Sequence, residues 1–132
     1  VPVSLPPLIK AYRVQEKAAN VGFDWESPED VWAKVKEEIT EFEEELERSR
    51  AASGKSGKPV PTPEMLAEYG DLLFSLVNAG RLYDSALELT NKKFITRFNA
   101  VEEAARKQGR GLKDMSLEEM EQLWQQAKSK EN

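Results

Sequence analysis

The stretch KVKEEITEFEEELE, residues 34–47, decides the fold class of this chain. Seven of the eleven positions from Glu37 to Glu47 are glutamates, and apolar residues interrupt them three or four positions apart. This spacing places the apolar residues along one face of an α-helix. The stretch therefore predicts a long helix with one apolar and one acidic face.

Helix start signals stand at each break in this pattern. "SPED" and "TPEM" each pair an N-cap, Ser27 or Thr62, with a proline at the first helical position. "SALE" (85–88) and "SLEE" (116–119) have the sequence of capping boxes. The predicted helices span residues 5–20, 28–50, 63–83, 86–108 and 117–130. No segment alternates like a strand, so we predict an all-α helical bundle of about five helices, three or four of them long, in a single domain over residues 1–132.

Composition narrows the function classes. The chain has 132 residues, 39% of them hydrophobic and 33% charged, and a net charge of −5. An acidic chain lacks the excess of Lys and Arg that general nucleic-acid binding needs. No segment reaches the roughly 18 apolar residues of a membrane span, and the N-terminus lacks the features of a signal peptide. We therefore expect a cytoplasmic protein with no nucleic-acid or membrane partner. The missing initiator Met suggests processing, or a domain cut from a longer protein.

The chain contains no Cys and no His. This excludes disulfides, Cys/His zinc sites, a thiolate nucleophile and a Ser-His-Asp triad. Any catalysis must then depend on carboxylates, and an all-carboxylate ligand set favours hard cations such as Mg²⁺ or Mn²⁺.

The glutamates of residues 34–47 are unevenly placed around the helix. Glu38, Glu41 and Glu45 border the apolar stripe, whereas Glu37 and Glu44 point towards the far side, with Glu47. Glutamate-rich helix faces are usually only solvated. A solvated face therefore remains the alternative to a functional site.

A second acidic pair lies in AEYGDLLFSLVN, residues 67–78. Glu68 and Asp71 are three residues apart on the border of that helix's apolar stripe, with Gly70 between them, where a missing side chain permits close approach. If the two stripes pack together, the carboxylates converge on one patch, and divalent cations would relieve their repulsion. The four carboxylates are Glu38, Glu41, Glu68 and Asp71.

Two of these patterns resemble a known signature. EEITE (37–41) followed by EYGD (68–71) resembles the EExxE…ExxD signature of the MazG-like all-α nucleoside triphosphate pyrophosphohydrolases. Further segments resemble the C-terminal catalytic domain of that family, in the same order. They are NVGFDW (20–25), GDLLFSLVN (70–78), NKKFITRF (91–98) and LWQQAKSKE (123–131). The resemblance covers nearly the whole chain.

The resemblance implies Mg²⁺-dependent hydrolysis of a nucleoside triphosphate between its α- and β-phosphates, giving a monophosphate and pyrophosphate. It implies that the four converging carboxylates ligate the metal, with Glu37 as a supporting carboxylate. Mn²⁺ is a possible substitute. Metal ions of this kind neutralise phosphate oxygens and acidify a water for in-line attack.

Several other side chains are candidate nucleotide contacts. Arginine suits phosphate binding and tryptophan suits stacking on a base. The candidates are Asn78, Lys93, Arg97, Trp124 and Lys128. The alternatives are that Trp124 belongs to the core and that Lys93 and Arg97 are ordinary surface charges. We expect Phe23 and Trp25 to form a hydrophobic lid on the bundle rather than a base pocket.

The length of the second predicted helix indicates an assembly. At 1.5 Å per residue, roughly 23 residues span about 35 Å, which is long for the core of a 132-residue chain. We therefore expect a homodimer, and the resemblance adds that both chains contribute to the active site. The alternatives are a narrower dUTP- or dCTP-type hydrolase, a non-catalytic helical interaction or regulatory module, and a domain that binds nucleotide without turnover.

Overall fold

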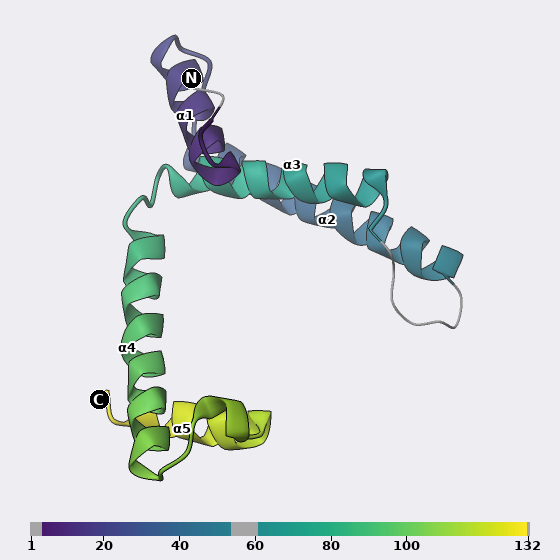
Figure 1. Cartoon of the computed structure of the whole chain (residues 1–132). Helices are drawn as coiled ribbons and strands as arrows, with labels where there is room; N and C mark the ends of the chain where they lie inside the picture. Colours follow the sequence, from purple (N-terminus) through teal and green to yellow (C-terminus); the bar gives the residue numbers. More distant parts are fainter. Residues whose placement is uncertain (1–3, 54–60, 132) are drawn as a thin grey trace. The chain divides into compact units, whose positions relative to one another are not determined.

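The computed structural model describes residues 4–53 and 61–131, and these residues form five α-helices with no strand (Figure 1). This confirms the all-α prediction. The turn-rich loop expected at residues 53–61 lies almost wholly outside the described residues. The helices are α1 (Pro7–Asn20), α2 (Pro28–Ser53), α3 (Pro63–Gly80), α4 (Ala86–Lys107) and α5 (Leu117–Ser129), with a short 3₁₀ turn, η2 (Leu112–Asp114), before α5.

Local capping explains where three of the helices begin. Ser27 Oγ accepts a hydrogen bond from the Asp30 N–H at 3.3 Å, and Thr62 Oγ1 accepts one from the Met65 N–H at 3.1 Å. Ser116 and Glu119 form the expected capping box. Each bond satisfies a backbone N–H that the first helical turn leaves without an intrahelical partner.

The capping box expected at Ser85 was wrong. Ser85 does precede α4, but its backbone is helical (φ −88°, ψ −9°) and its side chain makes no capping hydrogen bond. An N-cap normally has an extended backbone, which directs its hydroxyl at the N–H groups of the first turn. The helical backbone of Ser85 does not provide that geometry.

The chain divides into two compact units, Val1–Asp84 and Ser85–Asn132. In the first unit α2 and α3 lie side by side and α1 packs against α3 (Figure 1). Its core contains Val31, Val35 and Ala79, with Leu72 packed against them. Val35 is fully buried, whereas Ile39, one turn further along the same predicted stripe, is 37% exposed. The core therefore covers only part of the apolar face of α2.

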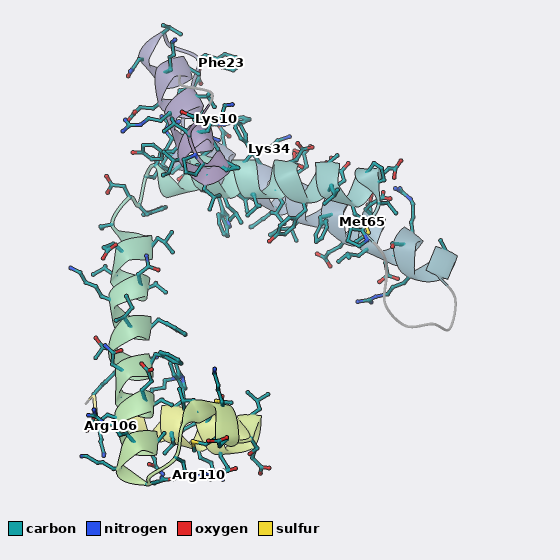
Figure 2. The ribbon with its side chains drawn as sticks, viewed as in Figure 1. Lys10, Phe23, Lys34, Met65, Arg106 and Arg110 are labelled. Carbon is teal, nitrogen blue, oxygen red and sulfur yellow. The ribbon has the colours of Figure 1, made fainter. Side chains whose placement is uncertain are left out.

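In the second unit α4 packs against α5. Val101, Ala105, Met115 and Leu123 form its core. Arg110, in the turn after α4, donates hydrogen bonds to the Glu119 carboxylate and to the Asp114 carbonyl (Figure 2). The turn begins at Gly109, whose φ of +71° suits a glycine.

Two further observations concern Gly70 and the length and apolar character of the helices. A Cβ atom added at Gly70 would meet nothing within 4 Å among the described residues, so the close approach expected there is wrong for this part of the chain. None of the helices in residues 4–53 and 61–131 is long and apolar enough to cross a membrane.

Candidate functional site

Three carboxylates converge between α2 and α3. One oxygen each of Glu38, Glu41 and Glu68 lies within 4.8 Å of the other two. Glu38 is buried, at 5% exposed, and the other two are half-buried. They meet because Glu38 and Glu41 occupy one border of α2, and this border faces the corresponding border of α3.

The other two predicted site carboxylates are placed differently. Asp71 is exposed and lies outside the three-carboxylate group, although it lines the same cavity as Glu38. Glu37 is also exposed, and its carboxylate lies 3.7 Å from Lys34 Nζ. The structure therefore brings together three of the four predicted metal ligands.

The electrostatics of this group favour a cation. The Glu38 carboxylate raises the pKa of Glu41, with smaller contributions from burial and from Glu68. Lys34 Nζ lies 2.9 Å from Glu38 Oε1, and this hydrogen bond raises the pKa of Lys34. The remaining oxygens, Glu38 Oε2 and Glu68 Oε2, are buried with no hydrogen-bond partner among the described residues.

A buried carboxylate oxygen that accepts no hydrogen bond lowers the stability of the folded protein. A hard divalent cation such as Mg²⁺ takes oxygen ligands and would satisfy both atoms. The residues present therefore fit a metal of this class, on the evidence of their own unsatisfied oxygens.

A cavity of about 560 Å³ lies within the first unit, next to this group. One part of its lining is charged, from Lys34, Glu38 and Asp71, and another part is apolar. The apolar lining residues are Val14, Ala18, Phe23, Trp25 and Phe74. The other lining residues are Gln15, Ser75 and Asn78 and the ion-paired Asp24 and Arg81. Phe23 and Lys34 are labelled in Figure 2, on the turn after α1 and on α2.

Specific hydrogen bonds hold the walls of this cavity. Arg81 donates to Asp24 Oδ2 at 3.1 Å and to Asn78 Oδ1 at 2.8 Å. The first bond ties the turn after α1 to the end of α3, and it lowers the pKa of Asp24. Gln15 Nε2 donates to the Phe74 carbonyl at 2.8 Å, which ties α1 to α3. Asn78, a predicted substrate contact, therefore lines the cavity, and its side-chain oxygen accepts the hydrogen bond from Arg81.

The other predicted substrate contacts belong to the second unit. Lys93 and Lys128 are exposed. Arg97 is held by Glu131 through two hydrogen bonds, of 2.8 and 2.9 Å, and its guanidinium lies 5.7 Å from the centre of the Trp124 ring. The Phe94 ring lies 5.3 Å from that of Trp124. Arg97 is therefore an organised side chain rather than a free surface charge.

Comparison with curated proteins shows which proteins this chain is similar to. Over 128 residues, 94% of this chain, it is 37% identical to the nucleoside triphosphate pyrophosphohydrolase/pyrophosphatase MazG of Thermotoga maritima. Over 135 aligned positions, 99% of the chain, it is 38% identical to the nucleoside triphosphate pyrophosphohydrolase of Escherichia coli K12. The chain is MazG-like. It spans about half the length of these relatives, 45% and 48%.

Two further comparisons complete this result. Over 69 residues, which are 49% of this chain, it is 51% identical to the uncharacterized protein YabN of Bacillus subtilis. This match covers 14% of YabN. No known protein-family model matches the chain.

Sequence reasoning missed three residues of this candidate site: Gln15, Lys34 and Arg81. Lys34 had a usable signal, because a Lys four residues before Glu38 faces it across one helical turn. Gln15 and Arg81 had none, since their partners, Phe74 and Asp24, are 59 and 57 residues away.

Proposed function

We propose that this MazG-like chain carries a Mg²⁺-dependent nucleoside triphosphate pyrophosphohydrolase activity, which cleaves between the α- and β-phosphates to release pyrophosphate. The observation that supports this most is the group of Glu38, Glu41 and Glu68, with two buried oxygens that lack a donor among the described residues. The names of the two relatives that match nearly the whole chain point to the same reaction.

In this proposal Glu38, Glu41, Glu68 and Asp71 hold the metal, and Glu37 supports them. The Mg²⁺ supplies positive charge against the phosphate oxygens and acidifies a water. Lys34 Nζ, 2.9 Å from Glu38 Oε1, places a positive charge beside this buried side chain in the metal-free protein. The apolar cavity wall beside Glu38 limits water around the reacting phosphate.

The triphosphate also needs cations from the protein. We assign this role to Lys93, Arg97 and Lys128, and we assign nucleotide contacts to Asn78 and Trp124. Arg97 is oriented in advance by Glu131 and Trp124, so its guanidinium loses little further freedom on meeting an anion. A phosphate would have to replace the Glu131 carboxylate, which offers two oxygens in a similar arrangement.

We further propose that the active form is a homodimer. Large apolar side chains remain about half exposed on α3 and α4, among them Phe74 at 48%, Tyr69 at 47% and Phe94 at 54%. Exposed aromatic side chains of this kind are typical of surfaces that associate.

The decisive experiment measures pyrophosphate release from the ribo- and deoxyribonucleoside triphosphates, with Mg²⁺, with Mn²⁺ and with a chelator. We expect release from several triphosphates with either metal and none with the chelator. Release restricted to dUTP or dCTP would indicate the narrower hydrolase. No release under any condition, with tight binding to a basic protein, would replace the proposal with a non-catalytic interaction module.

A further inference from the structure

Glu131 lies just beyond the end of α5 and contacts Arg97 of α4. Two hydrogen bonds join these side chains, from Arg97 Nε to Glu131 Oε1 at 2.8 Å and from Arg97 Nη2 to Glu131 Oε2 at 2.9 Å. The Arg97 side chain is 15% exposed and that of Glu131 33%. Two parallel bonds from a planar guanidinium are also the arrangement in which an arginine binds a phosphate. The carboxylate therefore occupies the same donors that a phosphate would use.

Positive charge surrounds the Glu131 carboxylate. The hydrogen bond from Arg97 lowers the pKa of Glu131, and the charges of Lys93 and Lys128 lower it further. Lys93 precedes Arg97 by one turn of α4, and Lys128 lies near the end of α5, which packs against α4. Glu131 carries one negative charge against these three positive ones, so the group still attracts anions while Glu131 is in place.

The Arg97 guanidinium keeps a second support if the carboxylate leaves. Arg97 Cζ lies 5.7 Å from the centre of the Trp124 ring, and the Phe94 ring lies 5.3 Å from that ring on its own account. A cation–π contact does not consume the N–H donors of the guanidinium. Glu131 is held more loosely, because it lies outside the helix and its backbone N–H donates to the Lys128 carbonyl at 3.3 Å. An incoming anion would therefore displace Glu131 and leave Arg97 in position.

Competition from within the chain sets a threshold for every phosphate ligand. Because Glu131 belongs to the same chain, its effective concentration at Arg97 is on the order of millimolar or higher. A triphosphate and its phosphate-containing products then lose the same factor in affinity. The triphosphate has three phosphate groups with which to contact these cations, whereas each product has fewer. The same loss therefore leaves the substrate bound and favours release of the products.

We propose that Glu131 regulates this site as an internal competitor. Its carboxylate holds Arg97 in the ligand-free protein, each phosphate ligand displaces it on binding, and the products leave faster as a result. The inference rests on the proposed function for the identity of the substrate and products. The displacement itself needs only a phosphate ligand, so it can be measured without turnover.

Calorimetry with inorganic triphosphate, in the presence of a chelator, tests the displacement. We expect Glu131→Gln to bind this anion roughly tenfold more tightly than wild type, because a neutral amide competes for the guanidinium less than a carboxylate does. Glu118→Gln, at an exposed position in the first turn of α5, removes the same charge and should change the affinity by no more than about twofold, since solvent and salt screen it.

A double-mutant cycle assigns the effect to the pair of side chains. In an Arg97→Ala background, adding Glu131→Gln should give no gain in affinity for inorganic triphosphate, because the donors for which Glu131 competes are gone. Glu131→Ala in the wild-type background should give the same gain as Glu131→Gln. It also removes the amide oxygen, through which a glutamine could still accept a hydrogen bond from Arg97.

Steady-state kinetics give the second readout. With a triphosphate that wild type cleaves, Glu131→Gln should lower KM and the inhibition constant of pyrophosphate by a similar factor. It should leave kcat unchanged, or lower it if product release limits the rate. If no triphosphate is cleaved but Glu131→Gln binds inorganic triphosphate more tightly through Arg97, the internal competitor stands and the proposed reaction fails.

Four results would overturn the inference. Glu131→Gln and Glu131→Ala would bind inorganic triphosphate no more tightly than wild type, as expected if the carboxylate only positions Arg97. Glu118→Gln would show the same gain, which would indicate a general effect of charge. The gain would persist in the Arg97→Ala background, which would place the anion elsewhere. Absence of binding in wild type and in every variant would exclude the anion site, whether or not triphosphates are cleaved.

Discussion

Lys34 Nζ lies 2.9 Å from Glu38 Oε1, one helical turn along α2, so a partly exposed cation neutralises the most buried carboxylate of the site. The Lys34 side chain is 38% exposed and that of Glu38 only 6%. In the metal-free protein this ion pair has the role that a metal has in the proposed complex.

Lys34→Met is expected to destabilise the metal-free protein and to increase its response to Mg²⁺. The substitution leaves Glu38 buried without a counter-ion, and we expect a cost of about 1 kcal/mol, because Lys34 is partly screened by solvent. Mg²⁺ would remove this cost, so the difference in Tm between Mg²⁺ and chelator should be larger than in wild-type protein. An unchanged Tm in chelator would show that the pair contributes nothing to stability.

Glu41→Gln and Asp71→Asn are expected to abolish nearly all pyrophosphate release. Metal-free Glu41→Gln should be at least as stable as wild type, since the Glu38 carboxylate that raises the pKa of Glu41 would no longer face a second negative charge. In wild-type protein, Mg²⁺ at about 100 times its Kd should add roughly 2.7 kcal/mol to the free energy of unfolding, and both variants should lose most of it.

The control is Glu44→Gln, an exposed position on the same helix. It should change neither activity nor the response to Mg²⁺. If Glu41→Gln releases pyrophosphate as fast as Glu44→Gln, the acidic face of α2 is only solvated surface.

Arg97→Ala and Lys128→Ala should both reduce kcat/KM for triphosphates but should differ in stability. Lys128 is exposed, so its removal should change the free energy of unfolding by no more than about 0.5 kcal/mol. Arg97→Ala breaks two hydrogen bonds to Glu131 and uncovers Trp124, so its Tm should fall below that of Lys128→Ala. Unchanged kcat/KM in both variants would remove these residues from the proposed site.

Acid should weaken the second unit through Glu119. The hydrogen bond from Arg110 lowers the pKa of Glu119, with a further contribution from the Ser116 N–H. Because the folded-state pKa is below the unfolded one, this stabilisation is present above the unfolded pKa and is lost as the pH falls through the folded one. Glu119→Gln should therefore lower Tm at pH 7 and have a shrinking effect towards pH 3. Glu102→Gln, at an exposed position of α4, is the control, and a pH-independent effect of Glu119→Gln would contradict the role of its charge.

Assembly has a direct test. Light scattering at micromolar concentration should give a mass near twice the 15.0 kDa of one chain, because the exposed aromatic side chains of α3 and α4 are then covered by a second copy. A mass near 15.0 kDa would exclude the homodimer.

Short-range signals were sufficient for most of the fold. Thr62 and Ser116 cap their helices through bonds that depend only on the next three residues, so their sequence pattern predicts them. Ser85 has the same pattern but a helical backbone, which the pattern does not specify. The periodicity of α2 also predicted that Glu38 and Glu41 lie on one border, where Glu68 meets them.

The rest depended on contacts between remote helices. The burial of Gln15 follows from the packing of α1 on α3, and its partner Phe74 is 59 residues away. Phe23 and Trp25 were expected to form a lid, and their place in the cavity lining depends on the Arg81–Asp24 bond that holds their turn. Asp71 shares a border with Glu68 in sequence, yet it lies outside the carboxylate group and lines the cavity beside Glu38. Helical periodicity specifies the face on which a side chain lies but not the position of its terminal atoms.

The turn at Gly109 affects how the chain reaches its native state. It closes a hairpin of α4 and α5 over residues 108–116, and loops of about ten residues close within roughly 10–100 ns. The hydrogen bond between Gln15 and Phe74 must instead close a loop of 59 residues, which costs more chain entropy and makes this a slower, non-local contact. We therefore expect the α4–α5 hairpin to form early during refolding and the cavity around Gln15 to be completed late.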